Sequence, residues 1–296
     1  MMRNKMKYRE ALQLAQDKLH TVGIMDATTD AFYLLEFLTS MTRKDYLLQM
    51  ETEIPQNIYL EYMELVERRA TREPLQHITG VQEFMGIQFM VNSHVLIPRQ
   101  DTELLVEHTV EAIRNMHILQ QNNQIQYLDI CTGSACIPIS VAVHSKLETS
   151  QLAITASDIS LQALEIATTN VRKIAPQIEL LHSDLFDEID GMYDVISSNP
   201  PYIVSSVLPT LEVEVRDYDP SLALDGGEDG LEFYRRIIEG CQKHLKVGGI
   251  LLFEIGYDQG QAVSELMVQH GFRSVEVLQD LANLDRVVKG VREHDY

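Results

Sequence analysis

The chain of 296 residues contains no uninterrupted apolar stretch of about 18 residues, the length that a membrane-spanning helix requires. The basic start, Met1–Lys7, leads into an amphipathic pattern, so we expect no signal peptide. Only three cysteines are present and none forms a CxxC pair, which argues against a disulfide framework and a thiolate metal site. The ten histidines lack the HxxxH spacing of a metal-binding helix. We therefore expect a cytoplasmic protein with no membrane segment and no metal.

Positive charge is scarce in the second two thirds of the chain. Residues 99–296 carry 14 Lys and Arg against 31 Asp and Glu, a net charge of −17, whereas residues 1–98 carry −3. Non-specific nucleic-acid binding depends on cationic contacts to phosphate, so we expect no direct nucleic-acid binding. The run Glu212–Glu232 contains eight carboxylates and a single cation, Arg216. We interpret this run as a solvated loop face, and a mobile lid beside the site is the alternative.

Apolar residues recur at helical spacing in three stretches of the first 80 residues. These stretches are Tyr8–Leu19, Ala31–Leu38 and Ile58–Arg69, with Asp30 or Thr28 as a cap for the second. The pattern predicts a small helical-bundle domain over residues 1–80. Around Met85-Gly86 the apolar residues alternate instead, which predicts a β-hairpin linker over residues 81–98.

From residue 99 onward, apolar runs typical of buried strands alternate with helical patterns. The predicted strands are Gln126–Ile130, Leu152–Asp158, Ile178–His182, Tyr193–Asn199, Gly249–Ile255, Arg273–Leu278 and Arg286–Val291. The predicted helices include Thr102–His117, Ala135–Leu147, Leu161–Ile174 and Leu231–His244. This alternation predicts an α/β fold for residues 99–296, with a doubly wound, mostly parallel sheet of seven strands.

The tetrapeptide Asn199-Pro200-Pro201-Tyr202 closes one of these strands. Because proline supplies no N–H to a ladder, the two prolines must lie where the strand ends, and open α/β sheets bind their ligands at that end. The Asn199 amide oxygen and the Pro200 carbonyl are two rigidly held acceptors for a single NH2 group. Tyr202 offers a flat face for the planar group that carries this NH2. An ordinary turn after a buried strand is the alternative interpretation of the tetrapeptide alone.

The turn after the first predicted strand has a single glycine, Gly133, where a dinucleotide site has three at GxGxxG spacing, so NAD is disfavoured. The turn still predicts a nucleoside site, because Asp158 ends the second strand and can accept hydrogen bonds from ribose hydroxyls. S-adenosylmethionine has no phosphate, and its positive groups suit a pocket with Asp129, Asp158 and Asp184. Each aspartate is alternatively a helix cap or a turn residue.

Four further segments resemble those of a known family. Pro98–Glu103 is similar to its PRPETE element and Pro74–Gly80 to its PLQYITG element, while Phe253–Gly260 and Asp280–Arg286 are similar to later segments. Together with the tetrapeptide and the cofactor turn, they make the chain resemble the release-factor glutamine N5-methyltransferases called HemK or PrmC. This family belongs to the class I S-adenosylmethionine-dependent methyltransferases. The resemblance runs from the helical domain almost to the end of the chain.

The resemblance implies a Rossmann-like sheet, S-adenosylmethionine as cofactor, and methyl transfer to the glutamine side-chain amide in the GGQ motif of class I peptide chain release factors. By matching position, the cofactor would contact Cys131, Thr132, Gly133, Ser134, Ala135, Asp158, Asp184, Leu185 and Asn199. The glutamine would contact Asn199, Pro200, Pro201 and Tyr202, with Asn199, Pro200 and Tyr202 as catalytic residues, and Arg99 and Glu103 would border the pocket. Arg99 is alternatively a structural ion-pair residue. Residues 1–80 carry none of the cofactor motifs and are expected to recognise the release factor.

The chain departs from the family pattern in the cofactor turn. Cys131 and Ala135 stand where the family has glycine, and Leu185 stands where it usually has tryptophan. A Cβ at position 131 or 135 would crowd the cofactor if the backbone there needs a positive φ. Two other functions stay open: a nucleic-acid methyltransferase acting on adenine N6 or guanine N2, and a catalytically inactive binding protein of the same fold.

Overall fold

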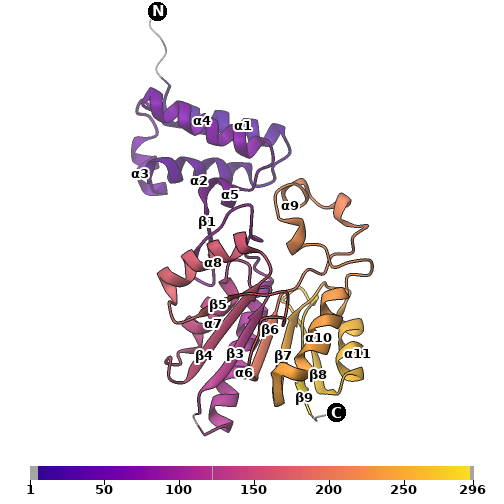
Figure 1. Cartoon of the computed structure of the whole chain (residues 1–296). Helices are drawn as coiled ribbons and strands as arrows, with labels where there is room; N and C mark the ends of the chain where they lie inside the picture. The colour runs from indigo at the N-terminus through magenta and orange to yellow at the C-terminus, as the bar shows by residue number, and fades with distance from the viewer. Residues whose placement is uncertain (1–5, 122, 294–296) are drawn as a thin grey trace, which may run out of the picture. The chain divides into compact units, whose positions relative to one another are not determined.

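The computed structural model describes residues 6–121 and 123–293 (Figure 1). The chain divides into two compact units. The first comprises the chain up to Gly80 together with the segment Glu212–Tyr218, and the second comprises Val81–Leu211 and the chain from Asp219 onward. Within the described residues, no helix combines the length and the apolar character needed to cross a membrane.

The first unit is a bundle of helices. Its helices are α1 (Tyr8–Thr21), α2 (Ala27–Thr39), α3 (Arg43–Gln49), α4 (Gln56–Ala70), α5 (Leu75–Thr79) and α9 (Val213–Arg216). The predicted apolar faces form its core, as Leu12 and Leu19 of α1, Leu35 of α2 and Tyr62 of α4 are buried together. Sequence periodicity missed the short α3, which Thr42 caps by accepting a hydrogen bond from Asp45 N.

The expected capping of the second helix was wrong. The N-cap of α2 is Asp26, and Asp30 is buried inside the unit, where its carboxylate accepts a hydrogen bond of 2.7 Å from Arg69 Nε. Arg69 occupies the apolar face of α4 because this carboxylate compensates its charge. The buried residues at helical spacing that predicted α4 therefore include a cation, Arg69, as well as apolar side chains.

Part of the acidic run Glu212–Glu232 also belongs to the first unit. Glu214 of α9 accepts a hydrogen bond of 2.6 Å from Arg72, and Arg69 lies 3.4 Å from the same carboxylate. Tyr218 donates to the Thr71 carbonyl over 2.9 Å. Glu214 is therefore not part of a solvated loop face, because its carboxylate pairs with arginines at the end of α4, whereas the Glu212 side chain in the same segment is 83% exposed, as expected.

The second unit starts with the predicted hairpin. Strands β1 (Val81–Phe84) and β2 (Ile87–Met90) pair antiparallel, and Phe84 faces Ile87 across the turn. Met85 and Gly86 both have positive φ, 51° and 75°, which is the backbone of a two-residue hairpin turn.

The main sheet has seven strands in the order β5-β4-β3-β6-β7-β9-β8. The strands are β3 (Ile125–Ile130), β4 (Leu152–Asp158), β5 (Glu179–His182), β6 (Tyr193–Ser198), β7 (Leu245–Glu254), β8 (Phe272–Gln279) and β9 (Asp285–Arg292). The pairs β5-β4-β3-β6-β7 are parallel, and β9 is antiparallel to both of its neighbours. The prediction of a doubly wound, mostly parallel, seven-stranded sheet is confirmed.

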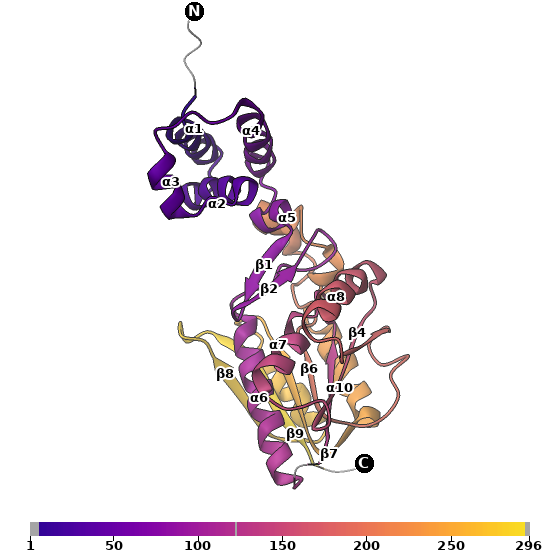
Figure 2. The same cartoon turned by 90° about the vertical axis from the view of Figure 1, so that its left-hand side faces the viewer.

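Helices cover both faces of this sheet (Figure 1, Figure 2). One face packs against α6 (Thr102–Leu119), α7 (Cys136–Ser145) and α8 (Leu161–Ile174), and the other against α10 (Glu232–His244) and α11 (Gly260–Gln269). Successive residues of a strand point to opposite faces of the sheet, so they pack into two separate apolar cores. Tyr127 and Val195 lie in the core on the side of α6, α7 and α8, and Leu128 and Ile196 lie in the core on the side of α10 and α11.

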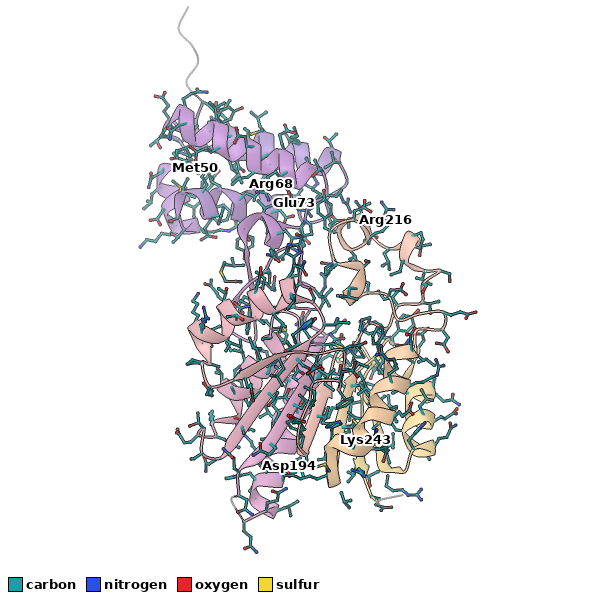
Figure 3. All side chains as sticks on the ribbon, in the orientation of Figure 1. Met50, Arg68, Glu73, Asp194, Arg216 and Lys243 are labelled. Carbon is teal, nitrogen blue, oxygen red and sulfur yellow. The ribbon has the colours of Figure 1, made fainter. Side chains whose placement is uncertain are left out.

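One buried carboxylate, that of Asp194, links the amino ends of the central strands through hydrogen bonds. Asp194, labelled in Figure 3, accepts hydrogen bonds from the side chain of Gln120, from Gln126 N and from Lys246 Nζ, each within 2.8 Å. These contacts join the end of α6 to β3, β6 and β7. The carboxyl ends of the same strands, at the opposite edge of the sheet, are the place for a ligand.

Candidate functional site

A cavity of about 330 Å³ lies at the carboxyl ends of β3, β4, β5 and β6. Strand order reverses at β3, which has β4 on one side and β6 on the other, so the cavity sits at the topological switch point of the sheet. Its volume is within the range of roughly 300–1,000 Å³ that small-molecule sites occupy. The fold thus provides a ligand site where the sequence predicted one.

Most of the predicted site residues line this cavity. They are Arg99, Cys131, Thr132, Gly133, Ser134, Asp158, Asp184, Leu185, Asn199 and Pro201. The other four lie outside its lining as far as the described residues show. Ala135 and Pro200 are buried beside it, Tyr202 turns its hydroxyl toward Glu254, and the Glu103 carboxylate accepts a 3.4 Å hydrogen bond from Met85 N.

The cofactor turn has the backbone of a glycine-rich loop although it contains one glycine. Cys131, Gly133 and Ala135 all have left-handed φ, at 61°, 54° and 63°. The two departures from the family pattern therefore fall at positions that require positive φ, where a Cβ costs about 1–2 kcal/mol. Cys131 is among the residues that line the cavity, and burial raises the pKa of its thiol, so it is a small uncharged residue there.

Asp158 holds this turn closed. Its carboxylate accepts hydrogen bonds of 2.8 Å from Gly133 N and 2.9 Å from Ser160 N. Burial raises the pKa of Asp158, and these backbone donors act against the shift. A carboxylate has about four acceptor sites, so Asp158 can also accept from a ligand. The turn-residue interpretation of Asp158 thus holds in the structure, and its ribose role stays a prediction.

The side chains around the cavity fit S-adenosylmethionine better than a phosphate-bearing cofactor. Asp158 and Asp184 bring negative charge to the lining, and Ser134 and Thr132 add hydroxyls. The two arginines in the lining are each paired: Arg99 with Asp219 over 2.7 Å, and Arg236 with Asp184 over 2.8 Å. A nucleoside bearing a positive sulfonium suits such a site, whereas a phosphate would meet no free cation among its described residues.

Several lining residues were not predicted from the sequence. Phe233 and Arg236 come from α10, and Pro220 and Leu222 come from the second part of the acidic run. Nothing in the amphipathic pattern of α10 separates these positions from other surface residues. The run therefore does border the site, as the lid alternative required, while its mobility stays a prediction.

The tetrapeptide at the end of β6 is held by residues at and after the end of β7 and by the start of α6. Tyr202 donates to Glu254 Oε1 over 3.5 Å, and Gln259 Nε2 donates to the Tyr202 carbonyl over 3.0 Å. The amide of Asn199 donates to Thr102 Oγ1, at the start of α6, over 3.4 Å. The segment Phe253–Gly260, which carried part of the family resemblance, is thus a support for the tetrapeptide.

Two buried carboxyl groups lie close to the site. Asp129 accepts a 2.6 Å hydrogen bond from Ser197, and its burial raises the pKa to about 7. Burial likewise raises the pKa of Glu254 to about 7. Glu254 was not singled out from the sequence, although an acid directly after the apolar run Ile250–Phe253 is the signal that identifies it.

Comparisons with known proteins agree with this architecture. Residues 10–80 match the family described as PrmC N-terminal domain, and residues 102–211 match the methyltransferase small domain. The hMettl16 catalytic domain, solved in complex with the MAT2A 3′UTR hairpin 6, has the same fold. Its TM-score is 0.56 at 16% identity, and the alignment covers 78% of this chain and 83% of that one.

Relatives align over nearly the whole chain. The release factor glutamine methyltransferase of Clostridium acetobutylicum is 36% identical, over 97% of this chain and 99% of its own length. The release factor glutamine methyltransferase of Moorella thermoacetica is 38% identical, over 98% of this chain and 100% of its own. The chain is therefore an S-adenosylmethionine-dependent methyltransferase and belongs to the release factor glutamine methyltransferase family.

Proposed function

We propose that this protein transfers the methyl group of S-adenosylmethionine to the side-chain amide nitrogen, N5, of the glutamine in the GGQ motif of class I peptide chain release factors. One observation carries the proposal: Asn199, at the end of β6, lines the same cavity as the cofactor turn at the end of β3. The two strands are adjacent, with Ser198 paired to Ile130. An acceptor of NH2 hydrogens and the cofactor site thus share one cavity.

An amide nitrogen is a weak nucleophile because its lone pair is delocalised. The Asn199 amide oxygen and the Pro200 carbonyl would accept one hydrogen each from the substrate NH2 group, which points the nitrogen toward the methyl carbon. The cofactor supplies an electrophilic methyl group on its sulfonium. The N–C bond forms as the S–C bond breaks, and the nitrogen then releases one proton to solvent. Both acceptors also favour the positive charge that develops on nitrogen during transfer.

The assignment of individual site residues is part of this proposal. Cofactor contacts are supported for Cys131, Thr132, Gly133, Ser134, Asp158, Asp184, Leu185 and Asn199, because each lines the cavity. Pro201 and Arg99 also line it, which supports their placement beside the substrate. The Tyr202 hydroxyl donates to Glu254. This contact favours a role for Tyr202 in supporting the tetrapeptide, and it disfavours stacking of the Tyr202 ring on the substrate glutamine.

A nucleic-acid substrate is the second candidate, since the hMettl16 neighbour was solved with an RNA hairpin and shares the fold. The net charge of −17 over residues 99–296 disfavours it, because few cations are present to contact phosphate. The three cysteines are free, which agrees with the cytoplasmic setting that we propose.

We further propose that the first unit recognises the release factor. A glutamine in an exposed loop offers few contacts, so a second surface would raise the local concentration of the substrate at the cavity. Helix α2 exposes two aromatic side chains one turn apart, Tyr33 and Phe37, at 50% and 49% of their surface. Such aromatic residues are frequent anchors in protein interfaces.

The activity is tested by incubating the protein with tritiated S-adenosylmethionine and a release factor, its variant with the GGQ glutamine replaced, tRNA, rRNA or DNA. Label in the intact release factor alone supports the proposal. Label in nucleic acid, or in the variant as strongly as in the unchanged release factor, contradicts it.

The recognition role is tested with the double substitution Tyr33→Ser and Phe37→Ser. Methylation of the intact release factor should fall about tenfold or more, the effect of losing two aromatic anchors, while a short GGQ peptide is methylated as before. Leu60→Ser is the matched control, because Leu60 of α4 is 53% exposed and lies on another helix. Equal losses on protein and peptide would show that the first unit only supports the fold.

A further inference from the structure

Glu254 is a buried acid directly beside the catalytic tetrapeptide. It is the last residue of β7, and the parallel register pairs Ser198 with Phe253, which places Glu254 level with Asn199 on the neighbouring strand. Only 3% of its surface is exposed. The Tyr202 hydroxyl lies 3.5 Å from Oε1, and the buried Oε2 has no hydrogen-bond partner among the described residues. The side chains of Thr102 and Asn199 lie near enough to the carboxyl group to lower its pKa against the effect of burial.

The chemistry of these groups determines how Asn199 is oriented. An ionised carboxylate accepts hydrogen bonds and donates none, so it can face the NH2 side of the Asn199 amide but not the oxygen side. Asn199 Nδ2 also lies 3.4 Å from Thr102 Oγ1, on the same side. With its NH2 group held there, Asn199 has its oxygen left to accept a hydrogen from the substrate NH2.

We infer that Glu254 is a positioning residue for methyl transfer, whose carboxylate fixes the Asn199 amide with its oxygen toward the substrate glutamine. The inference rests on the function proposed above, in which Asn199 is an acceptor. Glu254 itself lies outside the cavity lining in the described part of the chain, so it acts through Asn199 and touches neither cofactor nor substrate.

The orienting effect depends on the charge of Glu254. A protonated carboxyl group has both a donor and an acceptor, so it tolerates either orientation of the Asn199 amide. Burial raises the pKa of Glu254 to about 7, so the group changes charge in the working range of the protein. The carboxylate, and with it the correct orientation, is present above this pH and is lost as the pH falls below it.

Other charged and titratable groups surround Glu254. Asp101, at the start of α6, raises its pKa further, whereas Arg286 of β9 opposes the shift. Tyr202 and Tyr234 stay neutral in this range because burial raises the pKa of each hydroxyl. Burial likewise raises the pKa of the Cys136 thiol, to about 12. Glu254 is thus the group in this cluster that titrates near pH 7.

The experiment measures kcat for release-factor methylation at saturating S-adenosylmethionine between pH 6 and 8.5. Wild type should show a rise of roughly five- to tenfold with a midpoint near 7, as a single group of that pKa ionises. Glu254→Gln should be at least about fivefold slower at pH 8, with no rise across the range, while its affinity for S-adenosylmethionine stays within about twofold of wild type. Its melting temperature should equal or exceed that of wild type at pH 8, because a buried charge is removed.

Asp129→Asn is the matched control, since Asp129 is the other buried acid with a pKa near 7 but lies beneath the cofactor turn. This variant should keep the rise with pH if Glu254 is its source. A flat wild-type profile, a rise that persists in Glu254→Gln, or a Glu254→Gln rate within twofold of wild type at pH 8 would overturn the inference.

A second variant covers the case in which Glu254→Gln does not fold. The residual activity of Asn199→Ala should no longer rise with pH, because no amide remains to be oriented, and a persisting rise contradicts the inference. The proposed function is judged separately, by whether wild type at pH 8 methylates the release factor at all.

Discussion

Arg69 gives the sharpest test of how the first unit is stabilised. Its guanidinium lies 2.7 Å from Asp30 Oδ2, and the two side chains are only 9% and 10% exposed. It also donates to the Glu73 carbonyl over 3.2 Å and lies 3.4 Å from Glu214. Burial raises the pKa of Asp30, and Arg69 is the main influence that opposes this shift. Arg69→Ala would therefore leave a buried carboxyl group without its partner.

The expected cost of Arg69→Ala is about 3–5 kcal/mol, which is typical of removing one member of a buried ion pair. The neighbouring Arg68, labelled with Glu73 in Figure 3, provides the control, because the two side chains pair and that of Arg68 is 47% exposed. An exposed pair contributes about 0–1 kcal/mol, so Arg68→Ala should be nearly neutral.

Urea unfolding followed by circular dichroism measures this difference, fitted with separate transitions for the two units. Arg69→Ala should lower the midpoint of the first transition and leave S-adenosylmethionine affinity unchanged. The combined substitution Arg69→Met and Asp30→Leu should recover most of the loss, since an apolar pair of similar size needs no charge compensation. A cost for Arg69→Ala no larger than that for Arg68→Ala would refute the reasoning.

Three further predictions concern the catalytic unit. Asn199→Ala should lower kcat by about 30-fold, or 2 kcal/mol, with little change in cofactor affinity by calorimetry, and turnover within threefold of wild type would contradict its role. Asp158→Ala should weaken S-adenosylmethionine binding by roughly 1–3 kcal/mol and also lower the melting temperature without ligand, because Gly133 N and Ser160 N lose their acceptor. Asp129 has a folded pKa of about 7 against an ordinary 3.8, so the fold loses stability as the pH rises from about 3.8 to about 7, where the unfolded chain releases this proton and the folded chain keeps it, and the loss levels off above 7. The side chain of Asp129→Asn cannot ionise, so the unfolding free energy of this variant relative to wild type should grow by about 2–3 kcal/mol from pH 5 to pH 8. A difference that does not change with pH would exclude the ionisation of Asp129 as its cause.

The sheet and the cavity could be predicted because their signals are local. Each buried strand is an apolar run, and the two prolines after Asn199 mark a strand end without reference to any distant residue. The charge pairing could not be predicted in the same way. Glu214 stands in an acidic run that looks solvated, and its arginine partners lie more than 140 positions earlier in the chain. Only the folded chain brings them together, so composition alone assigned Glu214 wrongly.

The cofactor turn shows how strongly the fold constrains its backbone. Cys131 and Ala135 keep left-handed φ although neither residue favours it, and this strain costs about 1–2 kcal/mol per residue. Two bonds to the end of β4 hold the turn: Asp158 accepts from Gly133 N, and Thr132 N donates to the Ser157 carbonyl over 3.0 Å. Because these bonds join the ends of β3 and β4, relaxing the turn would break contacts between two central strands. Replacing glycine by Cys131 and Ala135 therefore adds backbone strain at the cofactor site but changes the shape of the turn little. The cavity that the family's chemistry requires is retained.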